Sequence, residues 1–185
     1  MTTPSSEPAA VTAMDADAIR KAIRRIAHEI IEQNSDVSRV VIAGIPTRGV
    51  EVARRIADHI ESVEGIRPQY GIVDVTMHRD DLATRGRITA VETTHLPLDL
   101  TGLTVVLADD VLFTGRTCRA AMDAIASFGR PARIQLAVLV DRGHRELPIR
   151  PDFVGRNVPT DPREKVRVCF ENVDGEADSV SVVKP

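Results

Sequence analysis

The stretch that most constrains the fold of this chain is the run VVLADDVLFTGRT at residues 105–117. Its first part, Val105 to Ala108, is apolar and predicts a buried strand, while the Ala-rich segment from Cys118 to Phe128 predicts a helix after the loop. Two adjacent carboxylates, Asp109 and Asp110, stand at the end of the predicted strand. The order strand, acidic pair, Gly/Thr loop and helix start predicts an α/β fold with its polar groups at one edge of a sheet.

The loop in this run has the properties of a phosphate-binding loop. The N-terminus of a helix offers unpaired backbone N–H groups and the positive end of the helix dipole. Gly115 permits a left-handed backbone, and the hydroxyls of Thr114 and Thr117 add donors. Asp109 and Asp110 suit Mg²⁺ or the hydroxyls of a sugar better than phosphate itself. The run has neither the GxGxxG of a dinucleotide fold nor the Gly-Lys-Ser/Thr of a P-loop, which excludes both at this position.

Length and composition limit the remaining classes. The 185 residues, 43% of them hydrophobic, suit one α/β domain with an elaborated loop or small subdomain. A net charge of −3 gives no global bias toward nucleic acid, and 3% of aromatic residues argues against a base-stacking platform for single strands. The sequence has no apolar run of transmembrane length and no pattern typical of a signal peptide, so we expect no membrane partner and a cytoplasmic location.

Hydrophobic periodicity predicts the other elements. Residues 1–14 predict a disordered tail ahead of a single domain at residues 15–185. Asp15 or Asp17 is expected to cap a helix that runs to about Glu32, because isoleucines recur in it every three or four residues. Further apolar runs predict a helix ending near residue 60 and strands at residues 40–43, 70–76, 134–140, 166–170 and 180–183. The β-α-β order predicts a mainly parallel sheet with helices on both faces.

Two further loops are expected at the same edge of the sheet as the acidic pair. The loop at residues 44–49 links a strand to a helix, and Thr47, Arg48 and its backbone N–H groups suit a second anion such as a diphosphate. A plain Pro/Gly turn is the alternative for this loop. Residues 141–163 contain four prolines, which exclude a long helix and predict a small hood over the site.

A charged stretch at residues 77–87 predicts an exposed flap, which returns as a hairpin strand at residues 88–91. Such a flap would exclude water from a hydrolysable substrate, and Arg79, Arg85 or Arg87 could close over a diphosphate. A solvated charged hairpin is the alternative interpretation.

These segments together resemble the bacterial PyrR family, whose members regulate pyrimidine operons and also act as uracil phosphoribosyltransferases. Residues 105–117 match the signature of type I phosphoribosyltransferases, which bind 5-phosphoribosyl-1-diphosphate (PRPP), and the runs at 74–82, 141–150 and 153–160 are similar to those of PyrR. The resemblance covers about residues 15–183. It implies the type I phosphoribosyltransferase fold, in which a central, mainly parallel sheet is flanked by helices and carries a flap hairpin and a small hood.

The resemblance implies the reaction of uracil with PRPP to give UMP and diphosphate, with Mg²⁺ as cofactor. Asp109 and Asp110 would hold ribose hydroxyls and stabilise positive charge, and Arg87 would join them as a catalytic residue. The Mg²⁺ would lie on substrate oxygens near the two aspartates, with no certain direct protein ligand. The implied uracil site is Asp141, Arg142 and Val166. The implied PRPP and UMP site is Thr47, Arg48, Val111, Leu112, Phe113, Thr114, Gly115, Arg116 and Thr117.

The regulatory activity of the family implies binding of UMP or UTP and of leader RNA from pyrimidine operons, by a homo-oligomer that is a dimer or larger. Lys21, Arg25 and His28 are spaced by four and three residues and therefore share one helix face, opposite the isoleucines. The RNA-binding face implied by the resemblance is Lys21, Arg25, His28, His144, Arg145, Arg150 and Arg156. A solvated helix face is the alternative for these residues, and a purine or xanthine phosphoribosyltransferase without RNA binding is the alternative function.

Overall fold

The computed structural model of the chain describes residues 10–76, 94–97 and 99–185. Its main sheet has the strand order β3-β2-β4-β5-β6, and every pairing in it is parallel. The predicted α/β fold with a parallel sheet is therefore confirmed. The strands are β2 (Val40–Gly44), β3 (Gln69–Ile72), β4 (Thr104–Leu112), β5 (Arg133–Asp141) and β6 (Phe153–Asn157).

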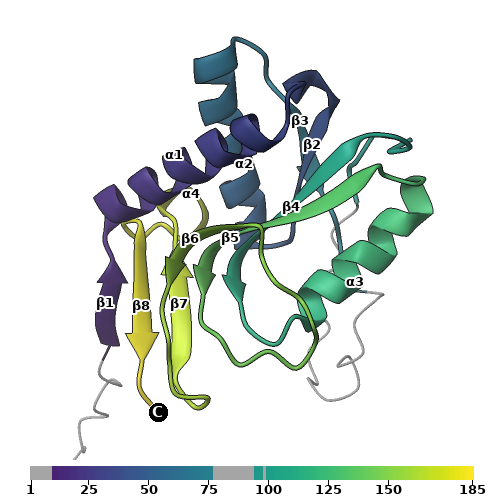
Figure 1. Cartoon of the computed structure of the whole chain (residues 1–185). Coiled ribbons are helices and arrows are strands. Elements are labelled where there is room, and N and C mark those ends of the chain that lie inside the picture. Colours follow the sequence, from purple (N-terminus) through teal and green to yellow (C-terminus); the bar gives the residue numbers. More distant parts are fainter. Residues whose placement is uncertain (1–9, 77–93, 98) are drawn as a thin grey trace, which may run out of the picture.

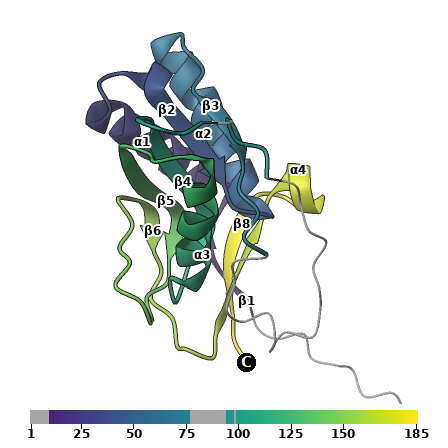
Figure 2. The same cartoon turned by 90° about the vertical axis from the view of Figure 1, so that its right-hand side faces the viewer.

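Helices cover both faces of this sheet (Figures 1 and 2). The long helices α1 (Ala16–Gln33) and α2 (Arg48–Glu64) pack on one face, against Ile42 of β2 and Val106 of β4. The helix α3 (Arg116–Ile125) packs on the opposite face, where the alternate strand residues point. Short 3₁₀ turns lead into β2 and out of α3, at Val37–Arg39 (η1) and Ala126–Phe128 (η3).

The first helix forms as its sequence predicts. Asp15 is the N-cap of α1, and its carboxylate accepts a hydrogen bond of 2.8 Å from the backbone N–H of Ala18. The isoleucine stripe, from Ile19 to Ile30, is buried against the sheet. Among the described residues, no helix is both long enough and apolar enough to cross a membrane.

The segment before α1 differs from the sequence prediction. Residues Ala10–Met14 form a strand, β1, which pairs antiparallel with β8 (Ser179–Val183). β8 also pairs with β7 (Lys165–Cys169), and the four-residue helix α4 (Glu171–Asp174) connects the two. The prediction of a disordered tail is therefore wrong for residues 10–14. Their ladder partner lies at the other end of the chain, so the local composition of the segment does not reveal it.

The predicted hood at residues 141–163 also differs from the structure. Its residues 153–157 are β6, an edge strand of the main sheet, and only the loops on either side leave the sheet. The structure also has a second sheet beside the main one, the three-stranded antiparallel sheet β1-β8-β7, which is assembled from both ends of the chain (Figure 1). The predicted flap at residues 77–87 and its return at 88–91 lie outside the described residues.

Candidate active site

A cavity of about 540 Å³ lies at the carboxyl end of β4. The end of β4, the loop that follows it and the first turn of α3 form most of its wall, and Arg142, Glu146 and Val166 complete it. The continuous part of the lining is Asp109, Asp110, Val111, Leu112, Phe113, Thr114, Gly115, Arg116, Thr117 and Cys118. The predicted phosphate loop and the acidic pair therefore line one cavity, at the edge where loops beyond parallel strands are expected to bind ligands.

The strand β4 extends further than its apolar run predicts. It continues to Leu112 because β5 pairs with it up to the register Leu112 to Asp141. Asp109 and Asp110 are thus strand residues rather than the start of a loop. The ladder fixes their backbone, which orients the two carboxylates better than a loop would.

The loop backbone suits a phosphate. Gly115 is the N-cap of α3 with φ of 93°, so a side chain there would be strained, and a Cβ would lie 3.3 Å from side-chain atoms of Ile149. The N-cap residue Gly115 has no side chain that could bond to the first turn of α3, so the start of this helix suits an anion. The hydroxyl of Thr114 accepts a weak hydrogen bond of 3.4 Å from the N–H of Arg116.

The acidic pair is packed closely against the start of α2. Asp109 is buried, and one of its oxygens accepts a hydrogen bond of 2.9 Å from the N–H of Asp110. Gly49 lies against the same backbone: a Cβ on Gly49 would stand 2.5 Å from the carbonyl oxygen of Ala108 and 3.3 Å from Oδ1 of Asp109. Only glycine fits at this position, so the start of α2 sets the position of Asp109.

The segment after β5 is hydrogen-bonded to the predicted phosphate loop. The backbone N–H groups of Glu146 and Leu147 both donate to the carbonyl oxygen of Thr114, at 3.0 and 3.2 Å. The carboxylate of Glu146 also accepts a hydrogen bond of 2.7 Å from Nε of Arg116. Glu146 was not predicted as a site residue, because no pattern in the neighbouring sequence indicates that its carboxylate reaches Arg116, thirty residues earlier.

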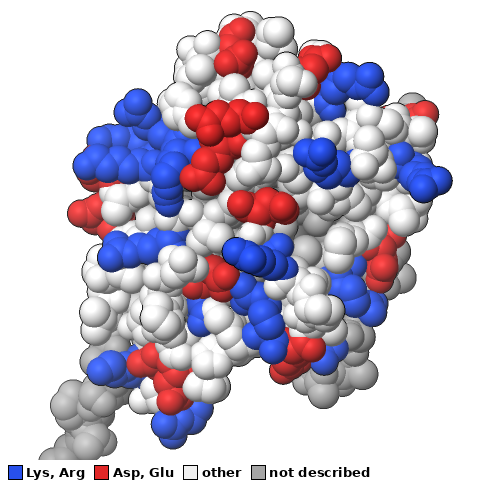
Figure 3. Space-filling view, viewed as in Figure 1, with Lys and Arg blue, Asp and Glu red and all other residues white. Residues whose placement is uncertain are grey.

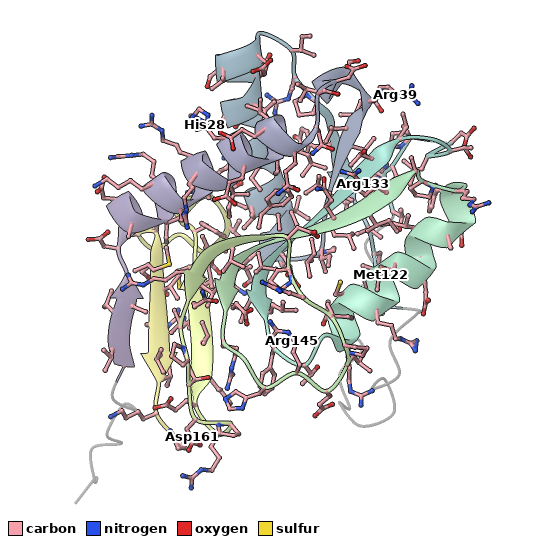
Figure 4. The ribbon with its side chains drawn as sticks, viewed as in Figure 1. His28, Arg39, Met122, Arg133, Arg145 and Asp161 are labelled. Atoms are coloured by element: carbon pink, nitrogen blue, oxygen red, sulfur yellow. The ribbon has the colours of Figure 1, made fainter. Side chains whose placement is uncertain are left out.

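Arg145 belongs to the same segment, and its side chain lies inside the loop that follows β5 (Figure 4). Its guanidinium donates to the carbonyl oxygens of Phe113, at 2.8 Å, and Ile149, at 3.1 Å. It also pairs with the carboxylate of Asp141 at 2.5 Å. Asp141 does not line the cavity, since its carboxylate is turned toward Arg145 and the N–H of Gly143.

Arg142 forms a wall of the cavity and is almost completely buried, with 6% of its surface exposed. Its guanidinium carbon lies 4.0 Å from the centre of the Phe113 ring, and Nη2 donates to the carbonyl oxygen of Asp161 at 3.1 Å. Burial lowers the pKa of Arg142. Its Nε is buried and has no hydrogen-bond partner among the described residues. Arg142 therefore holds an unused donor beside the cavity, and Val166 of β7 lines the same space.

Arg48 and Thr47 lie beside this cavity but do not line it. Arg48 points to α4, where Nη2 and Nε donate to the two carboxylate oxygens of Asp174 at 2.6 and 3.1 Å. The pKa of Arg48 is raised by this hydrogen-bonded pair, and the negative charge of Asp110 adds to the effect. Thr47 is exposed at the N-cap of α2, after a cis peptide bond from Pro46.

Two of the remaining groups bear on the chemistry. Cys118 lines the cavity, but burial raises the pKa of its thiol to about 12, with Asp109 adding to the effect. It therefore stays protonated and cannot serve as a nucleophile near neutral pH. Asp109 and Asp110 provide the carboxylate oxygens that Mg²⁺ prefers, and they fit an ion that takes its other ligands from substrate and water. The described residues contain no cluster of three or more His, Cys, Asp or Glu side chains that could hold a metal.

The residues proposed for RNA binding divide into two groups. Lys21, Arg25 and His28 are exposed on α1, and Figure 3 shows Lys and Arg side chains gathered over that helix. Lys21 pairs with Asp17 at 2.6 Å, and Arg25 donates to the carbonyl oxygens of Val154 and Gly155 in β6. The ring of His28 lies edge-on to that of His59, with centroids 5.3 Å apart.

The second group follows β5. His144 is exposed and donates from Nε2 to the carbonyl oxygen of Thr160 at 2.6 Å. Arg156 donates to the carbonyl oxygen of Ala13 and so ties β6 to β1. Arg150 is exposed and no side-chain contact is found for it within the described ranges. Arg145 is occupied by internal contacts, as described above, and the predicted catalytic Arg87 lies outside the described residues.

The chain is similar to known proteins over most of its length. Residues 13–171 match the family model described as "Phosphoribosyl transferase domain". The "Bifunctional protein PyrR" of Roseiflexus sp. (strain RS-1) is 56% identical over 171 residues, which are 92% of this chain and 93% of that protein. The protein of the same name from Chloroflexus aurantiacus is 58% identical with the same coverage. A third, from Thermus aquaticus, is 55% identical over 88% of this chain and 90% of that protein.

Solved structures show the same fold at much lower identity. A hypoxanthine phosphoribosyltransferase from Staphylococcus aureus superposes with a TM-score of 0.71 and 14% identity, covering 100% of this chain and 98% of that one. Hypoxanthine phosphoribosyltransferase from Trypanosoma cruzi, in complex with the product IMP, also gives a TM-score of 0.71 at 14% identity, covering 99% and 94%.

Proposed function

The chain belongs to the phosphoribosyltransferase family and, within it, to the bifunctional PyrR proteins, and from this premise we propose two activities for it. The first is the synthesis of UMP and diphosphate from uracil and PRPP. The second is regulation of pyrimidine genes by uridine-nucleotide-dependent binding to leader RNA. The observation that supports the first most directly is the cavity walled by the phosphate loop and the acidic pair.

In this proposal the 5′-phosphate of the ribose occupies the loop from Thr114 to Thr117, against the N–H groups that start α3. Asp109 and Asp110 face the ribose ring, hold its hydroxyls, and stabilise the positive charge that develops as the bond to diphosphate loosens. Mg²⁺ bound with PRPP supplies charge neutralisation on the leaving diphosphate. Because the reaction needs no covalent nucleophile, the protonated thiol of Cys118 is no obstacle.

Uracil is proposed to lie against Arg142 and Val166, which line the cavity beside the loop and the acidic pair. The Arg142 side chain brings a guanidinium to the cavity wall, and its N–H groups suit a carbonyl oxygen of uracil. The Phe113 ring holds the guanidinium plane in place, so the donor is oriented before the base binds. A purine or xanthine phosphoribosyltransferase without RNA binding is the alternative, and competition of hypoxanthine and xanthine against uracil separates the two.

The catalytic proposal is tested by replacing both acids with their amides. The double variant Asp109→Asn, Asp110→Asn is expected to lose UMP synthesis by about 100-fold or more, since each carboxylate stabilises charge only in the transition state. Asp123→Asn is the matched control, because this exposed residue of α3 pairs with Arg119 away from the cavity. Turnover in the double variant equal to that of the control would refute the assignment.

The regulatory proposal is tested with residues whose loss does not disturb the phosphate loop. Lys21 and Arg150 are exposed, whereas Arg145 fastens that loop and would confound the result. Lys21→Gln and Arg150→Gln are each expected to lower the slope of log affinity against log salt by about one for pyrimidine leader RNA. Arg130→Gln is the control, because Arg130 is exposed in the turn before β5, where its carbonyl oxygen accepts from the N–H of Gly102 ahead of β4. An equal loss in the control would mean that RNA binding is not confined to the proposed face.

A further inference from the structure

Two ion pairs join the connection between β7 and β8 to the helix α2. Arg48, the first residue of α2, pairs with Asp174 at the end of α4. Arg55, two turns further along α2, pairs with Asp178 just before β8. The side chains of both acids are largely buried, with 15% and 14% of their surface exposed, whereas the side chains of Arg48 and Arg55 are 35% and 21% exposed.

The Arg55 pair is sufficient to anchor this connection. Asp178 also accepts a hydrogen bond of 3.0 Å from the backbone N–H of Glu171, and the Arg55 guanidinium lies 4.6 Å from the centre of the Phe170 ring. A third link is the amide of Asn172, which donates to Glu51 of α2 at 3.3 Å. None of these contacts involves Asp174, so the connection stays attached to α2 without it.

Asp174 makes a more specific contact, because it binds one edge of the Arg48 guanidinium with both carboxylate oxygens. Its two oxygens accept from Nε and Nη2 of Arg48, and one of them also accepts from the backbone N–H of Phe170 at 2.9 Å. Two parallel hydrogen bonds of this kind fix the plane of an arginine as well as its position. The opposite edge of Arg48, carrying Nη1, has no partner within the described residues.

The backbone on either side of Arg48 is packed against the strand that carries the acidic pair. The loop before it is hydrogen-bonded to β4, since the N–H of Ile45 donates to the carbonyl oxygen of Ala108 at 2.9 Å. Gly49, the next residue, is packed against Asp109. Arg48 also lies within electrostatic reach of Asp110. Arg48 thus starts from a backbone fixed beside β4, and its side chain is held by Asp174 within electrostatic reach of Asp110.

Resting on the proposed function, we propose that Asp174 is a positioning residue that orients Arg48 to receive the diphosphate group of PRPP. Arginine otherwise loses several side-chain rotations when it binds an anion. A carboxylate that restricts these rotations beforehand improves binding of the diphosphate by roughly 2- to 10-fold. The role is confined to diphosphate, because the uracil and 5′-phosphate positions are formed by other residues.

The test uses the reverse reaction of the full chain, in which UMP and inorganic diphosphate are the substrates. Asp174→Asn is expected to raise KM for diphosphate about fivefold, with KM for UMP and kcat changed less than about twofold. Asp178→Asn is the matched control: it breaks the neighbouring ion pair on the same connection and is expected to leave KM for diphosphate unchanged. Thermal unfolding of each variant reports separately on loss of structure.

A double-mutant cycle shows whether Asp174 acts through Arg48. If it does, adding Asp174→Asn to Arg48→Gln causes no further rise in KM for diphosphate. If Asp174→Asn fails to fold, Asp174→Glu makes the test instead, since the longer side chain keeps the negative charge but displaces the two-point contact with Arg48. An unchanged or lowered KM in the folded variant, or an equal rise in Asp178→Asn, would overturn the inference. A wild-type protein with no activity in either direction would instead refute the proposed function, and the inference with it.

Discussion

Gly49 offers the sharpest test of how the fold positions the acidic pair. The substitution Gly49→Ala adds one methyl group, whose carbon would lie 2.5 Å from the carbonyl oxygen of Ala108 and 3.1 Å from the Cα of Asp109. Ordinary contact begins near 3.4 Å, so β4 or the start of α2 must retreat by roughly 0.9 Å. The atoms in the way are backbone, which cannot turn aside as a side chain would.

The magnitude of the effect follows from two opposing terms. Alanine is favoured over glycine within a helix by about 0.5–1 kcal/mol, while forcing extra volume into a packed interior costs about 1–3 kcal/mol. We therefore expect a net loss of about 1–2 kcal/mol in the free energy of unfolding. The catalytic effect should be larger, because a shift approaching 1 Å in a catalytic group costs about 100-fold in rate. We expect kcat/KM for PRPP to fall by roughly 10- to 100-fold.

The assay measures UMP formation and denaturant unfolding on the same preparations. Gly65→Ala is the control: Gly65 ends α2 with φ of 69° and has open space where a Cβ would be. Alanine there costs about 1 kcal/mol or somewhat more through its left-handed backbone, so the control loses comparable stability far from the site. Its kcat/KM should stay at the wild-type value. If Gly49→Ala retains wild-type kcat/KM, the view that α2 positions Asp109 is wrong.

Three further predictions concern groups in or near the site. Burial alone would raise the pKa of Glu51, but hydrogen bonds from Arg54 and Arg55 outweigh it and hold the pKa below the ordinary 4.5. The ionised carboxylate therefore stabilises the fold fully above pH 4.5, and this stabilisation is lost as the pH falls through the lowered pKa. Glu51→Gln should flatten the dependence of the free energy of unfolding on pH in this range, measured by acid unfolding. Cys118 should resist a maleimide at about pH 8 in the native protein and react after denaturation; rapid native labelling would contradict its burial and its pKa of about 12. Arg142→Lys should raise KM for uracil about tenfold with KM for PRPP unchanged, and equal rises in both would show that the site is distorted as a whole.

Much of the fold could be predicted because its signals are local. The apolar run before Asp109, the glycine at the start of α3 and the capping of α1 by Asp15 each depend on residues close together in sequence. The β-α-β order then restricts the sheet to parallel pairings and places loop chemistry at its carboxyl edge. For this reason the loop and the acidic pair that the sequence predicts to act together both line the cavity.

The features that were missed depend on contacts between distant segments. β1 forms only because β8, at the far end of the chain, offers a ladder. Glu146 reaches the phosphate loop from the segment after β5, and Asp174 reaches Arg48 across 126 residues. The motif around Arg48 indicated an anion site, but no pattern indicated the carboxylate that holds its guanidinium.

The account depends most on the claim that the loop from Thr114 to Thr117 holds the sugar phosphate while Asp109 and Asp110 face the ribose. The most direct test is a crystal structure of the protein with UMP. We expect the 5′-phosphate to accept hydrogen bonds from the backbone N–H groups of that loop, with the ribose hydroxyls at the two aspartates and uracil beside Arg142. A nucleotide bound elsewhere with this loop empty would contradict the account.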